Sequence, residues 1–242
     1  FLHRVGIPSM LCETQPKGTA QEPVRPFIYA HMPVKISEIP DDHEYYNLEP
    51  DAKTMKLIPE ALKADFITPI VEAFVKTCTA LIEGMPDKNI VVILDSSGWS
   101  HMDSGHKLSF RLLMPEVAVA MSTAAKIREK VAFHLRGNLE STAWLDYKSW
   151  DGEKMLPKEA FSDSMLHPLT WCCWSGKFMP EIKRWLRPFA LLQVQLESGE
   201  LQMDSLHEIN QSLKPEEWIK LGSPWPKSRR CRPERADYLE EC

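Results

Sequence analysis

The sequence lacks three features that would assign a protein to a class at once. Basic residues are not in excess, because 29 Lys and Arg stand against 34 Asp and Glu, and a formal net charge of -5 excludes a uniformly basic nucleic-acid coat protein. No apolar run approaches the roughly 20 residues that cross a bilayer, so we expect a soluble protein that does not bind membranes. The six cysteines form no Cys-x-x-Cys pair and are too sparse for a secreted disulfide scaffold.

These absences predict an intracellular protein, and they do not distinguish nuclear, mitochondrial and viral replication compartments. The chain begins at Phe1 without the layout of a signal peptide, which suggests a processed protein or an excised fragment. With 43% hydrophobic residues, 242 residues can bury a substantial core.

Apolar runs of two periodicities alternate along the chain and predict an α/β fold. Short β-branched or alternating runs predict strands, and runs with a spacing of three or four residues predict amphipathic helices. We expect the strands to share one mixed sheet and the helices to flank it. The expected strands cover residues 27–30, 90–95, 107–114 and 143–147, and the expected helices cover 60–83 and 116–136.

Composition divides the chain into three regions. Residues 1–26 hold four prolines among few apolar residues and predict an extended arm. Residues 27–170 carry the α/β pattern. Residues 171–242 are rich in Trp and Pro and predict a mostly helical extension, with helix over 180–187 and over 201–221 and a break near Pro215, followed by a basic tail.

Three motifs occur in the order that a known superfamily uses. The strand at 90–95 ends in Asp95-Ser96-Ser97-Gly98, the next strand carries Lys107-x-Ser109-x-Arg111, and Asp146 follows a hydrophobic residue in the last strand. Over about residues 27–160 this order resembles the archaeo-eukaryotic primase superfamily, and more narrowly the primase-polymerases and the primase modules of large DNA viruses.

That resemblance implies a nucleotidyltransferase fold and roles for particular residues. Ser96, Ser97, Lys107, Ser109 and Arg111 would contact the nucleotide phosphates, and Asp146 would be a ligand of catalytic Mg²⁺ or Mn²⁺. An active protein of this kind would be a DNA primase or polymerase that synthesises primers in DNA replication.

The sequence departs from the family pattern at two places. Residues 27–32, where the family has an acid pair that binds metal, contain no carboxylate, and Arg111 stands where the family has a histidine. Two-metal phosphoryl transfer needs several fixed carboxylates, whereas arginine still binds phosphate. We therefore expect a catalytically degenerate domain that acts as a nucleic-acid-binding or scaffold subunit of a larger assembly.

Two other hypotheses compete with this one. In an active enzyme, Asp146 would hold the metals together with an acid of the loop at residues 41–51, such as Asp41, Asp42 or Asp51. Alternatively the chain is an unrelated α/β protein in which the motif order is accidental. The acid pair discriminates between the first two hypotheses, and its absence favours the degenerate domain.

The basic tail predicts a binding segment. Five basic residues are concentrated near the C-terminus and repel one another, so we expect the tail to bind a polyanion or an acidic partner and to be disordered without it. The nucleic acid would be DNA or RNA, and protein subunits are the other expected partners. The five residues are Lys227, Arg229, Arg230, Arg232 and Arg235.

Each motif also has a purely structural interpretation. Asp146 can cap a turn, Ser96 and Ser97 are ordinary turn residues, and the polar residues at 107, 109 and 111 can form a solvated strand face. His101 and His106 lack the further ligands of a zinc site. The tryptophans can stack on bases or form a small core or partner interface; they are Trp171, Trp174, Trp185, Trp218 and Trp225.

Overall fold

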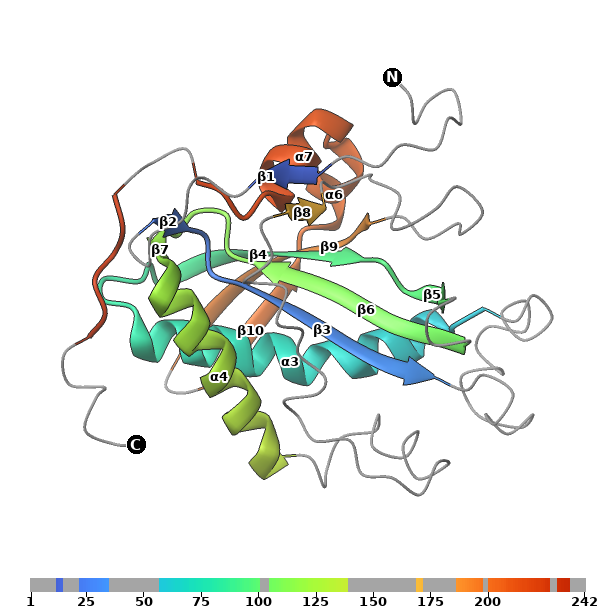
Figure 1. The fold of residues 1–242 in the computed structure, drawn as a ribbon, viewed down its shortest axis with the longest axis horizontal. Helices are drawn as coiled ribbons and strands as arrows, with labels where there is room; N and C mark the ends of the chain where they lie inside the picture. Colours follow the sequence, from blue (N-terminus) through green and yellow to red (C-terminus); the bar gives the residue numbers. More distant parts are fainter. Residues whose placement is uncertain are drawn as a thin grey trace.

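The computed structural model describes residues 12–14, 22–34, 57–100, 105–138, 169–171, 186–197, 200–226 and 230–235. Its centre is a six-stranded antiparallel sheet in the order β10-β9-β4-β6-β3, with β5 paired to β6 (Figure 1). The strands are β3 (Phe27–Val34), β4 (Lys88–Asp95), β5 (Gly98–Ser100), β6 (Gly105–Leu113), β9 (Arg187–Glu197) and β10 (Glu200–Ser205).

The central strands are those with the strongest β pattern. Residues 91–94 of β4 are completely buried, and so are residues 110–113 of β6, as expected for strands covered on both faces. The prediction that the runs at 27–30, 90–95 and 107–114 share one sheet is confirmed. The expectation of a mixed sheet is wrong for the described strands, because each of them pairs antiparallel with its neighbours. The expected fourth strand at 143–147 lies outside the described residues.

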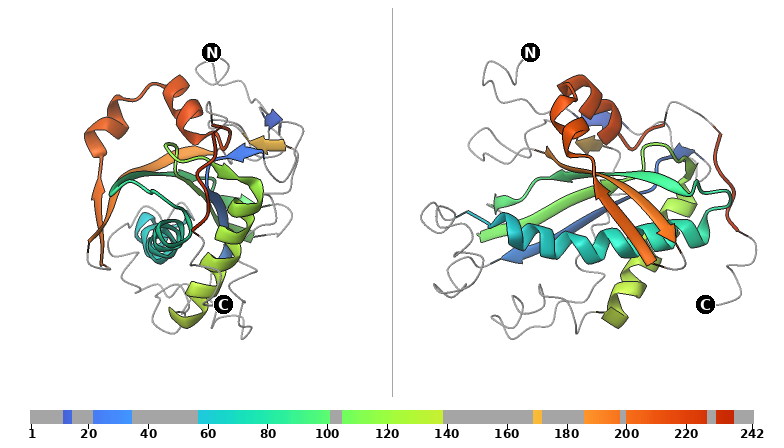
Figure 2. Two further views of the ribbon diagram at one scale, coloured as in Figure 1. Left: turned by 90° about the vertical axis from the view of Figure 1, so that its left-hand side faces the viewer. Right: turned by 180° about the vertical axis from the view of Figure 1, so that it is seen from behind.

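Two long helices cover one face of this sheet (Figure 2). Helix α3 (Glu60–Leu81) buries an apolar stripe that includes Phe66, Ile70 and Phe74, and helix α4 (Met121–Asn138) packs beside it. The second helix begins later than the predicted residue 116, because Val119–Ala120 forms a short strand, β7, that pairs with β2 (Pro23–Val24). A further short pair joins β1 (Cys12–Thr14) to β8 (Leu169–Trp171).

The expectation of a mostly helical region after residue 170 is wrong for residues 187–205. They form the hairpin of β9 and β10, which extends the central sheet. The predicted helix over 201–221 therefore does not form at 201–205, and residue 187, the predicted end of the helix over 180–187, is the first residue of β9. Pairing with β4 gives β9 a partner that local helical periodicity cannot reveal. Helices do follow in α6 (His207–Ser212) and α7 (Pro215–Gly222), with the expected break before Pro215.

Helices α6 and α7 lie on the opposite side of the sheet from α3 and α4 (Figure 2). Trp218 of α7 is 2% exposed, and Trp225 packs against the same core. Both residues therefore serve a hydrophobic core rather than an exposed stacking surface. Among the described helices, none is long and apolar enough to cross a membrane.

Candidate functional site

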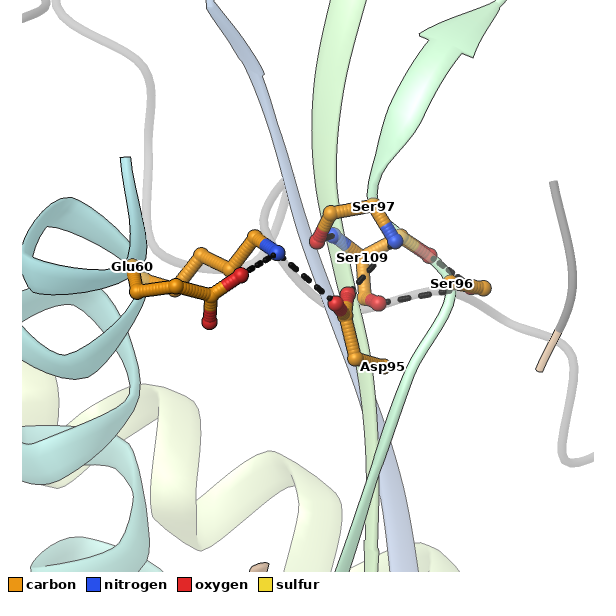
Figure 3. A network of polar contacts seen from close by, with 6 residues as sticks. Glu60, Asp95, Ser96, Ser97 and Ser109 are labelled. Carbon is orange, nitrogen blue, oxygen red and sulfur yellow. Dashed lines mark hydrogen bonds and ion pairs between the residues drawn. The ribbon is translucent and has the colours of Figure 1, made fainter. Parts of the chain in front are cut away.

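The two central motifs meet at the end of β4 (Figure 3). The Ser96 backbone N–H donates to the Ser109 carbonyl at 2.7 Å, and the Ser96 hydroxyl lies 3.0 Å from the Ser109 hydroxyl. The Ser109 backbone N–H donates to the Ser97 hydroxyl at 2.9 Å. The structure thus brings together the serines that the sequence singled out, and it does so through hydrogen bonds between the two motifs themselves.

Asp95, which was not among the predicted site residues, is the central acid of this cluster. Its side chain is buried, accepts the Ser97 backbone N–H at 2.6 Å and lies 3.1 Å from the Lys63 ammonium of α3. Lys63 also contacts Glu60 at 2.6 Å, so one ammonium bridges two carboxylates (Figure 3). The sequence signal was a lysine on the apolar face of an amphipathic helix, one turn before Phe66.

The charges around Lys63 determine its protonation. Burial alone would lower the pKa of Lys63, but the carboxylates of Asp95 and Glu60 outweigh that effect and raise it above the ordinary lysine value. Lys63 therefore remains a cation and cannot take a proton from a neighbouring serine. The cluster has the chemistry of a buried ion pair and not that of a serine-lysine nucleophile.

Arg111 lies on the other face of β6 from this ion pair. Phe110 contacts Phe66 of α3, with 6.0 Å between ring centroids, so the alternation of the strand directs Arg111 to the side of α7. The guanidinium is fully buried, donates to the Gly222 carbonyl at 3.2 Å and stacks on the Tyr29 ring at 4.7 Å. Among the described residues, its Nε and Nη2 have no hydrogen-bond partner.

This position differs from the one that the sequence predicted for Arg111. A phosphate could reach the guanidinium only after α7 had moved, because α7 covers it and Arg111 has no exposed surface. Lys107 and Ser109 share the same strand face by alternation; Lys107 is half-buried and Ser109 is buried. Of the three polar residues expected to line a nucleotide site, only Lys107 is partly open to solvent.

A second arginine completes the attachment of α7. The Arg25 guanidinium donates to the carbonyls of Lys220 at 2.6 Å and of Ser223 at 2.7 Å, at the C-terminal end of the helix. The last carbonyls of a helix carry partial negative charge and lack partners within the helix, so cations there are stabilising. Arg25 and Arg111 therefore hold the C-terminus of α7 against the sheet.

Part of the basic tail has a similar structural role. The Arg232 backbone N–H donates to the Ala118 carbonyl at 2.8 Å, and the Arg235 backbone N–H donates to the Leu81 carbonyl at 3.0 Å. The Arg232 guanidinium donates to the Gly84 carbonyl just after α3, and Gly84 adopts the left-handed conformation that ends many helices. The prediction of a tail that is disordered without a polyanion is therefore wrong for residues 230–235; Arg230 is exposed, and Lys227 and Arg229 lie outside the described residues.

Glu234 anchors this tail in a manner that depends on pH. Its carboxylate accepts the Thr123 hydroxyl at 2.7 Å and contacts the Lys126 ammonium at 2.6 Å. Partial burial would raise the pKa of Glu234, but the hydrogen bonds from Lys126 and Thr123 lower it below 4.5. A carboxyl with a lowered pKa in the folded state stabilises the fold above pH 4.5 and loses that contribution as the pH falls through the lowered value.

We therefore expect Glu234→Gln to remove part of the acid sensitivity of the tail. Hydrogen exchange of residues 230–235 is followed from pH 6 down to about pH 3 and divided by the intrinsic exchange rate at each pH; the protection of these amides should fall in the unmodified protein and change less in the variant. The exposed substitution Glu216→Gln on α7 is the control and should behave like the unmodified protein. Equal pH dependence in the Glu234→Gln variant would show that this carboxylate does not anchor the tail.

Several predicted site residues lie outside the described residues, namely Asp146, His101 and the loop acids Asp41, Asp42 and Asp51. His106 is described and lies against Trp99, with 5.2 Å between ring centroids. Within the described part of the chain, no group of three or more His, Cys, Asp or Glu residues is placed to hold a metal ion. In comparisons with known proteins, the chain matches no family model and no curated protein.

Proposed function

We propose that this chain is a primase-polymerase-like domain whose nucleotide-binding strand now stabilises its own fold, and that it serves as a non-catalytic subunit of a larger assembly. The buried Arg111 is the observation that carries this proposal. The resemblance would have Arg111 contact a nucleotide, whereas its guanidinium contacts a helix carbonyl and an aromatic ring.

Two further observations support a degenerate site. The resemblance expects an acid pair at residues 27–32, which belong to β3. This strand pairs directly with β6, and residues 27–34 contain no carboxylate. Asp95, the described acid nearest to the serine motifs, is neutralised by Lys63 inside the protein. Catalytic Mg²⁺ or Mn²⁺, if this chain used it, would depend on Asp146 and on a loop acid such as Asp41 or Asp42.

The use of the arginines favours a protein scaffold over a nucleic-acid-binding subunit. Four of them, Arg25, Arg111, Arg232 and Arg235, donate to main-chain carbonyls of this same chain. Nucleic-acid affinity depends on basic groups that can reach phosphates, and these four are committed elsewhere. Binding of DNA or RNA remains the second candidate, supported by the exposed Arg230 and by Lys227 and Arg229 in the sequence.

Nucleotide binding by an Arg111→Gln variant tests this proposal. Calorimetric titration with a nucleoside triphosphate and Mg²⁺ should give the same affinity, within about twofold, for the variant and the unmodified protein, because a phosphate does not reach Arg111. Arg187→Gln, at an exposed position of the same sheet, is the control. An affinity that falls about tenfold in Arg111→Gln alone, with an unchanged melting temperature, would contradict the proposal.

A further inference from the structure

The hairpin of β9 and β10 ends the central sheet on one side (Figure 2). Strand β10 pairs with β9 without interruption from Glu200 to Ser205, and five of its six residues are exposed. Natural proteins usually protect such an edge with lysine, proline or a bulge. Strand β10 contains no lysine, proline or bulge, and within the described part of the chain no strand pairs with its outer edge. This edge is regular enough to pair with a strand of another protein.

The register shows which backbone groups this edge offers. The Leu206 N–H donates to the Leu191 carbonyl at 2.9 Å, directly after the paired residues Ser205 and Leu192. Hydrogen-bonded positions alternate along an antiparallel pair, so the backbone groups of Gln202 and Asp204 bond to β9. Those of Leu201, Met203 and Ser205 point away from the sheet, toward an incoming strand.

The two faces of the hairpin differ in chemistry. Leu201 and Met203 lie opposite Leu196 and Val194 and form one apolar face. The other face carries Glu197, Glu200 and Asp204, all exposed. Residues 188–213 contain four acids and no Lys or Arg. The edge therefore presents two apolar side chains, Leu201 and Met203, on one face and two acids, Glu200 and Asp204, on the other.

This charge pattern argues against a second copy of the chain as the occupant. In antiparallel pairing of two β10 strands with the apolar residues on one face, Glu200 and Asp204 lie opposite or diagonal to acids of the other copy. In parallel pairing in register, each acid lies beside its own equivalent. Like charges at these positions are destabilising, whereas a strand with basic residues there would be attracted.

We infer that β10 is a docking edge that accepts one strand of a partner protein in which apolar residues alternate with Lys or Arg. The apolar residues of that strand would lie beside Leu201 and Met203, and its basic residues beside Glu200 and Asp204. The inference rests on the proposed function only in that it names the surface through which a scaffold subunit would join its assembly. Nothing in it depends on Arg111 or Asp146.

A short fluorescent peptide of alternating valine and lysine, titrated against the full chain and followed by anisotropy, tests this inference. Met203→Pro should weaken binding by about tenfold or more, because proline removes an outward N–H that the peptide would use. Its fold should persist, since an edge strand tolerates proline where the N–H faces solvent. Met203→Leu is the matched control and should bind within about twofold of the unmodified protein.

The charge of the edge is tested separately. The double variant Glu200→Lys/Asp204→Lys should lose the valine-lysine peptide and gain a peptide of alternating valine and glutamate. A peptide of alternating proline and lysine keeps the charge but cannot form a strand, and it should not bind. Equal binding of that peptide, or unchanged binding in Met203→Pro, would overturn the inference. Primer synthesis by the protein would refute the proposed function and leave this result unaffected.

Discussion

Replacing Lys63 with methionine should lower the free energy of unfolding by about 3–5 kcal/mol, because it leaves a buried carboxylate without its cation. The Lys63 ammonium lies 3.1 Å from Asp95, and both side chains are more than nine-tenths buried. Removal of one partner from such a pair is far more costly than loss of the pair's net interaction, since the remaining charge keeps its desolvation penalty. Chemical denaturation with a two-state fit measures the change.

The same helix supplies a matched control. Lys76 forms an ion pair with Glu72 at 2.7 Å, but the two side chains are 42% and 47% exposed. Lys76→Met should therefore change the free energy of unfolding by less than about 1 kcal/mol. Adding Asp95→Leu to Lys63→Met should recover part of the loss, because the orphaned charge is then removed as well. Equal effects of Lys63→Met and Lys76→Met would contradict the assignment of a buried ion pair.

Replacing Trp218 with alanine should also cost about 3–5 kcal/mol of unfolding free energy. Trp218 is 2% exposed and is the buried aromatic anchor of α7, the helix that covers Arg111. Its loss removes a large apolar side chain from the core and weakens the hold on α7. Hydrogen exchange should therefore accelerate first in residues 215–222 and at neighbouring positions of β4, which α7 contacts.

Trp99→Ala is the control for this substitution. Trp99 is 47% exposed on β5, so its removal should change stability by about 1 kcal/mol or less. If the two tryptophan variants unfold at the same denaturant concentration, Trp218 does not anchor α7, and the description of α7 as a fixed cover over Arg111 is wrong.

Local sequence pattern predicted the parts of the fold that depend on local chemistry. The β-branched run at 90–94 predicted a buried strand, and the apolar stripe of residues 62–81 predicted an amphipathic helix. Both form as expected, in β4 and α3. Residues 187–205 do not form the expected helix. Their mixed apolar and polar pattern becomes a hairpin because β9 pairs with β4 and β10 pairs with β9. The late start of α4 has the same cause, since β7 exists through its pairing with β2.

The candidate site shows the same division. The resemblance assigned Ser96, Ser97 and Ser109 to a phosphate site, and the structure shows these serines in hydrogen-bond contact with one another. The burial of Arg111 could not be predicted from its own strand, because the helix that covers it lies more than a hundred residues later in the chain. The same reason applies to the tail, because Arg232 and Arg235 meet the end of α3 only in the folded chain.

A primer-synthesis assay tests the central claim most directly. Purified protein is given a single-stranded template, nucleotides and either Mg²⁺ or Mn²⁺, beside an Asp146→Ala variant prepared in the same way. Each metal ion needs several fixed oxygen ligands beside a triphosphate, and residues 27–32, where the resemblance expects the acid pair, contain no carboxylate. We predict no template-dependent product from either protein. Product from the unmodified protein that disappears in Asp146→Ala would contradict the account and would assign a working metal site to Asp146 and a second acid.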